Sequence, residues 1–343
     1  GFTVDANGRK MSKSLGNVIS PQKVMDTLGA DVLRFWIASS DFTKEMTVSN
    51  EILDRSADSY RRIRNTCRFM LANLVGFNPA EHAVSELEMI SLDAHMIDRT
   101  RELQATIKSL YRNYKFSEIT QNLLQFCSID LGGFYLDIIK DRQYTCQKDS
   151  RPRRSCQTAL FHILNSLIRW MAPILSFTAQ EVWQAMSIKG SSQFVFSTTF
   201  ADIPNFQAIK SADWKKLQLI REVVIKALEV ARNDGLVRGS LASSVILYAD
   251  SENFETLADL GNELKFLTIT SSAVVEKLEK SPQSAFRDEK FQGLSVVVEA
   301  PPAPRCVRCW HHSFEIGSSP AHPELCRRCV VNVEGDGESR WYA

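Results

Sequence analysis

Apolar residues recur every three or four positions along much of the first two hundred residues, which is the spacing of one face of an α-helix. The pattern predicts helices over about 50–75, 92–114 and 152–171, and another helix that begins near Ser117. Long amphipathic helices joined by short connections pack together as a bundle. We therefore expect a fold that is mainly α.

Several helix starts are marked by local sequence signals. Ser20 and Pro21 supply a cap residue followed by a proline in the first turn, and Gly29 ends that short helix. Asp31 can cap a second helix, and residues 178–181 have the spacing of a capping box. These signals predict where the chain enters each helix.

The pattern changes after about residue 190, where helical periodicity gives way to short apolar runs. The predicted elements are a helix over 213–233, a strand over 244–249, a helical stretch over 252–261, and strands over 264–270 and 294–300. Strands separated by a helix indicate a small α+β unit. The prolines of PPAP, residues 301–304, form a stiff linker after it.

The composition is that of an ordinary soluble globular protein. The 343 residues are 44% hydrophobic and 24% charged, and the formal net charge is +1. No stretch approaches the roughly 18 apolar residues of a membrane span. A net charge near zero gives no global argument for nucleic acid, so such an argument must rest on local patches.

The eight cysteines fall into two groups. Four are scattered through helical segments, and four form two close pairs, Cys306 with Cys309 and Cys326 with Cys329. Each two-residue gap lets one turn aim both sulfurs at a single ion. The spacing predicts one structural Zn²⁺ held by four thiolates, which leaves no open coordination position for catalysis.

Other interpretations of these cysteines are open at this point. Scattered thiols favour a reducing compartment, here the cytoplasm, over a disulfide framework. Two pairs without a βαβ pattern are not typical of a thioredoxin-like redox motif. His311, His312 or His322 could replace one cysteine as a ligand.

The stretch GRKMSKSLGN, residues 8–17, places two lysines and two serines between glycines. Lys10 and Lys13 carry compact charges on flexible stems, which suits a polyphosphate whose charge moves during reaction. Ser12 and Ser14 could donate hydrogen bonds to the loop or to phosphates. An ordinary basic surface loop would have the same composition.

The word KMSKS resembles the signature loop of class I aminoacyl-tRNA synthetases. Further stretches resemble the bacterial-type isoleucyl-tRNA synthetases within that class: GADVLRFW (29–36), DSYRRIRNTCRFMLANL (58–74), FYLDIIKDRQY (134–144), RWMAPILSFTAQEVW (169–183) and the cysteine-containing tail. Valyl- and leucyl-tRNA synthetases share the loop and the bundle. The four-cysteine tail and the lack of a C-terminal heptad pattern favour the isoleucyl branch.

The resemblance implies an activity and its substrates. Members of this family use ATP with Mg²⁺ to form an isoleucyl adenylate and then load tRNA(Ile). Lys13 matches the family's ATP-contacting position, and Lys10, Ser12 and Ser14 would assist it. The HIGH-type motif, amino-acid pocket and editing domain precede this loop in the family. The chain is thus expected to be a C-terminal portion, monomeric and inactive without those domains; the alternative is a stand-alone zinc and tRNA-binding module.

The resemblance also implies a division of the chain. The expected segments are 1–30 as the end of a catalytic domain with the KMSKS loop, 31–90 as a helical connector, 91–200 as an anticodon-binding bundle, 201–300 as an α+β subdomain and 301–343 as a zinc-binding module.

Two basic patches are candidates for contact with tRNA. Residues 55–68 hold five arginines against one aspartate, and residues 140–154 hold six basic residues against two aspartates, so each patch has a net charge of +4. Arginines can hold RNA phosphates while aromatic rings stack on bases. A solvated helix face would show the same cluster of arginines. A tryptophan beside a zinc ligand, such as Trp310, could equally be packed on the metal site. The expected tRNA contacts are Arg142, Arg151, Arg153, Arg154 and Trp310.

Overall fold

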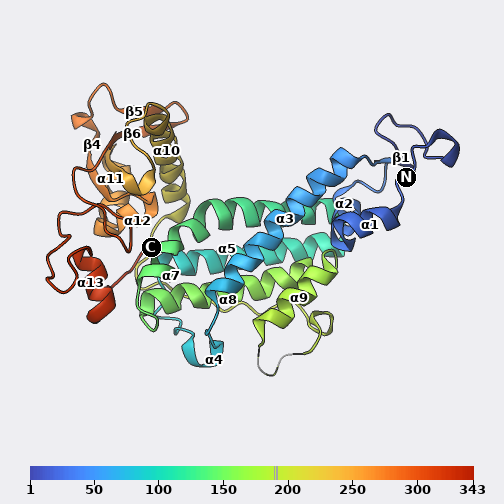
Figure 1. The fold of residues 1–343 in the computed structure, drawn as a ribbon, viewed down its shortest axis with the longest axis horizontal. Coiled ribbons are helices and arrows are strands. Elements are labelled where there is room, and N and C mark those ends of the chain that lie inside the picture. The colour runs from blue at the N-terminus through green and yellow to red at the C-terminus, as the bar shows by residue number, and fades with distance from the viewer. Residues whose placement is uncertain (189, 191) are drawn as a thin grey trace. The chain divides into compact units, whose positions relative to one another are not determined.

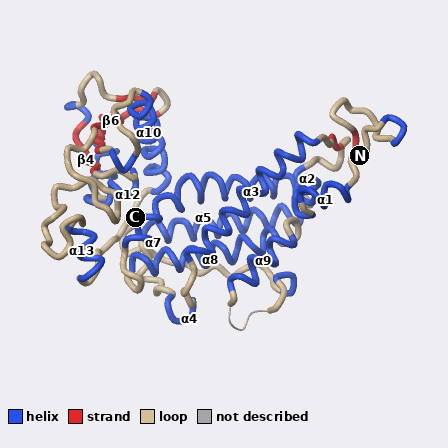
Figure 2. The backbone as a smooth tube through the Cα atoms, viewed as in Figure 1, coloured by secondary structure: helices blue, strands red, loops and turns tan. Residues whose placement is uncertain are grey.

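The computed structural model describes residues 1–188, 190 and 192–343. These residues form two compact units, each assembled from three segments of the chain. Unit 1 comprises Gly1–Pro79, Met96–Tyr135 and Gln157–Asn205, and unit 2 comprises Ala80–His95, Leu136–Cys156 and Phe206–Ala343. Helices dominate the described chain, and the strands are short (Figures 1 and 2). The mainly α fold with a small sheet is therefore confirmed, whereas the five-segment division stays a prediction.

Unit 1 is helical apart from one pair of two-residue strands. Its elements are β1 (Thr3–Val4), α1 (Pro21–Leu28), α2 (Ala30–Ser39), β2 (Met46–Thr47), α3 (Asn50–Asn73), α6 (Phe116–Gln125), a π-helical segment (Phe126–Tyr135) and α9 (Ser176–Met186). Helices α5 (Ser91–Arg112) and α8 (Arg151–Met171) contribute residues to both units. The short helix α4 (Pro79–His82) lies between α3 and α5 in the chain.

The long predicted helices are confirmed to within two residues at most ends. Helix α3 begins after Ser49, whose hydroxyl accepts a hydrogen bond from the Ile52 amide at 3.2 Å and so caps the helix. Ile63, Cys67 and Met70 of α3 are fully buried, because their three- and four-residue spacing puts them on the same face. Local periodicity is sufficient to place such helices.

Asp31 has a different role from the one predicted. It lies in the first turn of its own helix α2, but its carboxylate accepts hydrogen bonds from the Thr178 amide at 2.7 Å and the Thr178 hydroxyl at 2.6 Å. Helix α9 begins at Ser176, so the predicted capping box over 178–181 is wrong. A carboxylate from another helix satisfies amides at this N-terminus instead.

His162 of α8 is half-buried, and the loss of solvent around its ring lowers its pKa to about 4. Because the unfolded value is about 6.5, the unfolded chain binds a proton first as the pH falls. We expect this residue to reduce the free energy of unfolding by up to about 3 kcal/mol between pH 6.5 and pH 4. Denaturant unfolding of wild type and H162Q across this range measures the effect, since H162Q should lack that part of the pH dependence. Identical slopes in the two proteins would contradict it.

Unit 2 contains a four-stranded sheet with helices before and after it. The elements are α7 (Leu136–Thr145), α10 (Trp214–Asn233), β3 (Ser244–Ala249), α11 (Ser251–Ala258), α12 (Leu264–Thr268), β4 (Ser272–Lys277), β5 (Phe286–Asp288), β6 (Phe291–Glu299) and α13 (Arg327–Glu334). The strand order is β4-β3-β6-β5, and α10 packs against β6. Strands β3 and β4 are parallel, and the other two pairs are antiparallel.

The predicted strand over 264–270 is wrong. This run forms helix α12 and ends at Ile269, which adopts a left-handed conformation with φ +55°. The next residues form β4, which pairs in parallel with β3. A parallel pair needs a crossover between its strands, and the residues of α12 lie in that crossover. A short apolar run does not by itself distinguish a strand from a buried helix.

The last three residues of the chain are held inside unit 2. The buried carboxylate of Glu263 accepts hydrogen bonds from the amides of Trp341, Tyr342 and Ala343 at 2.8 to 2.9 Å. The carbonyl of Trp341 in turn accepts a hydrogen bond from the Ser91 amide at 3.0 Å. No helix in the described part of the chain has the length and apolar character needed to cross a membrane.

Candidate zinc centre and phosphate loop

The four predicted ligands converge on one point. The sulfur atoms of Cys306, Cys309, Cys326 and Cys329 all lie within 4.8 Å of one another, and all four residues are buried. The sulfurs of Cys309 and Cys326 are 3.6 Å apart, whereas a disulfide needs about 2.0 Å. A tetrahedron with Zn–S bonds of about 2.3 Å has edges of roughly 3.8 Å. The donor set therefore fits a four-thiolate zinc site.

Two tight turns bring these sulfurs together. The first turn is closed by a hydrogen bond from the Trp310 amide to the Cys306 carbonyl at 3.0 Å. The second pair spans the start of α13, where Cys326 occupies the N-cap position. The Cys326 amide also donates to the Cys306 sulfur at 3.4 Å, which links the two turns.

The three neighbouring histidines have other contacts. Nδ1 of His312 lies 2.7 Å from the Ala303 carbonyl, and Nε2 of His322 lies 2.6 Å from the Glu334 carboxylate. His311 packs its ring against Phe266. The geometry therefore favours four cysteines over a mixed ligand set.

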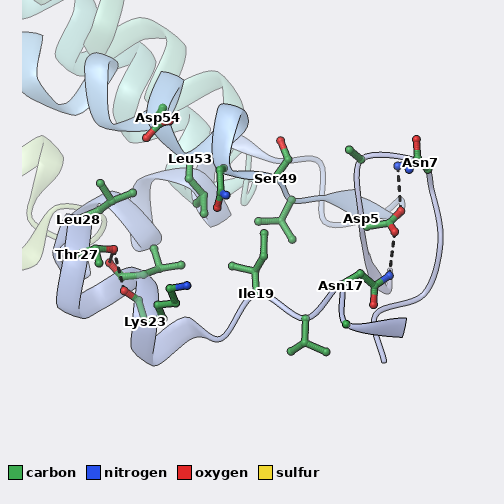
Figure 3. A pocket seen from close by; sticks show the side chains of 16 residues that line it. Asp5, Asn7, Asn17, Ile19, Lys23, Thr27, Leu28, Ser49, Leu53 and Asp54 are labelled. Carbon is green, nitrogen blue, oxygen red and sulfur yellow. Dashed lines mark hydrogen bonds between the residues drawn. The ribbon is translucent and has the colours of Figure 1, made fainter. Parts of the chain in front are cut away.

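The lysine loop is organised around Asp5. Its carboxylate accepts hydrogen bonds of 2.9 Å from the Asn7 amide and the Asn17 side chain (Figure 3). It accepts a third, also of 2.9 Å, from the Arg9 amide. The Asn17 hydrogen bond is the main reason why the pKa of Asp5 lies below its ordinary value, and the Arg9 amide adds to it. These bonds tie both ends of the loop to one side chain.

The four predicted phosphate-binding residues lie on the surface of this loop. Lys10, Lys13 and Ser14 are exposed and Ser12 is half-buried. The Ser12 hydroxyl accepts a hydrogen bond from the Leu15 amide at 3.3 Å and lies 3.1 Å from the Ser14 hydroxyl. The serines therefore shape the turn, while both ammonium groups remain available to an anion.

A cavity of about 740 Å³ lies beside the loop in unit 1. Asp5 and Asn17 line it on one side, and Lys23, Ser49 and Leu53 line it elsewhere (Figure 3). Neither Lys10 nor Lys13 is among its lining residues. The cavity is thus adjacent to the loop but separate from its two cations.

Two of the predicted tRNA-binding arginines are interior residues. Arg142 is completely buried and makes two hydrogen bonds of 2.8 Å to the carboxylate of Asp93. Arg154 is also buried and pairs with Asp149. In this structure neither guanidinium is accessible to a phosphate, because both side chains are buried and paired with carboxylates. Burying an arginine requires a partner of this kind, which sequence spacing alone did not reveal.

Arg151 and Arg153 are intermediate in exposure. The guanidinium of Arg151 lies 4.2 Å from the centre of the Trp341 ring and donates to the Arg340 carbonyl. Burial lowers the pKa of Arg151. These contacts make Arg151 a packing residue for the end of the chain as well as a candidate contact.

Trp310 borders an open cleft. Its side chain is 59% exposed and its backbone is left-handed, with φ +66°. The cleft, of about 410 Å³, lies between α7 and the zinc-binding turns within unit 2. Tyr144 of α7, 61% exposed, lines the same cleft together with Lys140 and Arg308. Two exposed rings and two cations thus share one concave surface.

The more exposed basic patch lies on α3. Arg62, Arg64 and Arg68 are exposed and have no ion-pair partner among the residues that the structure describes. Arg61 pairs with Asp58 at 2.9 Å, and Arg55 pairs with Glu51. The sequence indicated this patch, but its greater accessibility is evident only in the fold.

Family comparisons define the class of protein. The family model "tRNA synthetases class I (I, L, M and V)" matches residues 1–49, which include the lysine loop. The model "Anticodon-binding domain of tRNA ligase" matches residues 93–247, and "Zinc finger found in FPG and IleRS" matches residues 304–331. Three separate parts of the chain thus match models of tRNA ligases or of their zinc finger, and the zinc-finger match together with the four-cysteine cluster confirms the zinc prediction.

Similar proteins over the full length of the chain specify the branch. Isoleucine–tRNA ligases of Psychromonas ingrahamii and of Haemophilus influenzae strain 86-028NP are 54% and 51% identical to it over 100% of the chain. The chain spans 36% and 37% of the length of these relatives. The whole chain is therefore similar to one segment of isoleucine–tRNA ligases, in agreement with the predicted branch. A solved structure of methionyl-tRNA synthetase from Mycobacterium tuberculosis aligns with 61% of this chain and with 42% of the length of that synthetase. The two sequences are 12% identical, and the TM-score is 0.45.

Proposed function

We propose that this chain is the tRNA-binding portion of an isoleucine–tRNA ligase and that it supplies the lysine loop to the ATP site. The observation that carries the proposal is the similarity of the whole chain to part of the isoleucine–tRNA ligases, with an anticodon-binding domain match over 93–247. The substrates would be isoleucine, ATP with Mg²⁺, and tRNA(Ile). The chain would act together with the other two thirds of such a ligase.

Lys13 would act on the triphosphate of ATP. Its exposed ammonium stands at the tip of a loop that Asp5 and Asn17 hold together, so it can follow charge onto the departing pyrophosphate. Lys10 would add a second positive charge, and its ammonium lies 5.9 Å from the centre of the Phe2 ring. Ser12 and Ser14 would keep the turn in shape rather than bind phosphate directly.

Trp310 and Tyr144 would receive unstacked bases of the anticodon arm. Single-stranded RNA bases stack on exposed aromatic rings, while nearby cations hold the phosphates. The cleft between α7 and the zinc-binding turns offers both kinds of group. Arg151 and Arg153 are partly exposed and follow Tyr144 closely in the sequence, so they remain candidate contacts for tRNA.

The arginines of α3 would contact the sugar-phosphate backbone. Replacing Arg64 and Arg68 together by alanine should weaken tRNA binding about three- to tenfold, because two phosphate contacts are lost. The slope of log affinity against log salt should also fall by roughly one to two. Titration of labelled tRNA at several salt concentrations measures both quantities.

A matched control for this pair is the joint replacement of Arg232 and the exposed Lys215 of α10 by alanine, which also removes two positive charges. Arg232 is exposed on α10 and lies 3.9 Å from Glu229, so its loss changes the net charge without removing an unpaired arginine of α3. The control should leave the affinity and the salt slope unchanged. Equal losses in both proteins would mean that net charge, not the α3 surface, governs binding.

We also propose a cytoplasmic monomer. All eight cysteines are free thiols, which suits a reducing compartment and thiolate ligation of zinc. A stand-alone zinc and RNA-binding module was the alternative, but the lysine loop would have no use there. Isoleucine-dependent ATP–pyrophosphate exchange distinguishes the two: a ligase that contains this segment should catalyse exchange that depends on Lys13, whereas a stand-alone module would contribute nothing to exchange.

A further inference from the structure

The two zinc-binding turns share a feature that the zinc site itself does not use. Each Cys-x-x-Cys pair has an arginine immediately before its second cysteine, Arg308 in the first pair and Arg328 in the second. Both side chains reach α7, the helix that carries Tyr144. A zinc ion held by the four cysteines would therefore also fix the backbone positions of two arginines that contact one helix.

Arg328 makes the stronger of the two contacts. Its guanidinium forms a bidentate pair with the carboxylate of Asp141 on α7, with N–O distances of 2.6 and 2.8 Å. Arg340 donates to the same carboxylate at 2.6 Å, and Glu338 accepts from both arginines. Two carboxylates thus balance two guanidinium groups. Burial raises the pKa of Asp141, but the two arginines outweigh it and hold that pKa well below its ordinary value.

Arg308 contacts the end of the same helix. Its guanidinium donates to the Thr145 carbonyl at 2.7 Å, and Thr145 is the last residue of α7. Carbonyls in the last turn of a helix lack partners within the helix and carry partial negative charge, which a cation stabilises. Arg308 also lies 3.8 Å from the Cys329 sulfur, so it contacts a zinc ligand and the helix together.

The cleft lies where α7 and the zinc-binding turns meet. Asp137, Lys140 and Tyr144 form its α7 side, and Arg308 and Trp310 belong to the zinc-binding turns. The distance between the two exposed rings therefore depends on how the zinc-binding turns are held against α7. Asp141 also lines the cleft, and its carboxylate accepts from Arg328 of the second zinc-binding turn and from Arg340 near the end of the chain.

We propose that Asp141 is a positioning residue for RNA binding: through Arg328 it fixes the zinc-binding turns on α7 and so holds Trp310 at the cleft that Tyr144 also lines. Arg308 provides a second attachment. A zinc ion would serve RNA recognition indirectly, because it would fix the turns that carry Arg308 and Arg328, and both arginines bind α7. This inference rests on the proposed tRNA-binding function and adds a residue that does not itself need to touch RNA.

The test uses Asp141→Asn, which keeps the shape of the side chain but removes its charge. We expect full zinc content and an affinity for tRNA(Ile) about tenfold lower, the size of a typical coupling between neighbouring residues. Asp234→Asn, an exposed aspartate after α10, is the matched control and should bind normally. Metal analysis and tRNA titration of the purified chain give both quantities.

A double-mutant cycle separates positioning from general damage. If Asp141 acts by placing Trp310, D141N should weaken binding little further once Trp310 is replaced by alanine. Independent, multiplicative losses would overturn the proposal, and so would normal binding by D141N. Loss of zinc by D141N would also overturn the proposal, because Asp141 would then support the metal site itself rather than the placement of Trp310. Failure of the unmodified chain to bind tRNA would instead refute the proposed function.

Discussion

Replacing Cys329 with serine should remove zinc from the chain and unfold the segment around residues 304–331. A segment of this size buries too little apolar surface to fold alone, so metal binding supplies its folding free energy, about 10–16 kcal/mol in comparable zinc fingers. Metal analysis should give one zinc per wild-type chain and none in C329S. Affinity for tRNA(Ile) should fall at least tenfold, because Trp310 and the arginines of both turns lose their positions.

Cys67→Ala is the matched control for this substitution. Cys67 is a fully buried thiol of α3 in unit 1, so its replacement disturbs packing without touching the zinc ligands. The control should keep one zinc and normal tRNA affinity, and far-UV circular dichroism should show that the helices persist in both variants. Zinc retained by C329S at full stoichiometry would contradict the four-cysteine site.

Lys13→Ala should slow isoleucine-dependent ATP–pyrophosphate exchange about 100- to 1000-fold in a ligase that contains this segment. That is the range for removing one preorganised donor that stabilises transition-state charge. The reduction should be in kcat more than in the KM for ATP, because the charge on pyrophosphate develops during reaction. Binding of tRNA(Ile) should be unchanged, since the arginines of α3 and the cleft remain.

Lys44→Ala serves as the control for Lys13. Lys44 is a highly exposed lysine of unit 1 that lies 3.6 Å from Asp41, so its removal changes charge near the same end of the chain. Exchange should proceed at the wild-type rate in this variant. A wild-type rate of exchange in K13A would contradict the proposed role of the loop. The proposed tRNA-binding role would not be affected by that result.

The parts of the fold that local sequence determines were predictable. Helices α3, α5 and α8 follow from apolar residues at three- and four-residue spacing, and their ends lie close to the predicted positions. The zinc ligands follow from two short Cys-x-x-Cys turns, whose geometry needs little information from the rest of the chain. The lysine loop was likewise visible as a motif before any fold was known.

The parts that depend on distant partners were not predictable. Arg142 looked like a surface cation, but Asp93, far away in sequence, pairs with it in the interior. Asp31 looked like a cap for its own helix, but it caps α9. Residues 264–270 have the apolar pattern of a strand, but they form helix α12 in the crossover between the parallel strands β3 and β4. In each case the deciding contact joins residues that are distant in sequence, and local periodicity and spacing carry no information about such contacts.

The contact between the zinc-binding turns and α7 is marked in the sequence by a repeated arginine. Both Cys-x-x-Cys pairs place arginine immediately before the second cysteine, at Arg308 and Arg328. A repeated cation beside a metal site indicates either an anionic ligand or a docking partner. Only the fold shows that Asp141 is that partner for Arg328.

The central claim, that this chain binds tRNA(Ile) through its anticodon arm, is tested most directly by equilibrium titration of the purified chain. The titrations compare tRNA(Ile), the same tRNA with an altered anticodon, and an unrelated tRNA. We predict salt-sensitive binding that is tightest for tRNA(Ile) and weaker for both others. Equal affinity for all three RNAs, or no binding at low salt, would contradict the account.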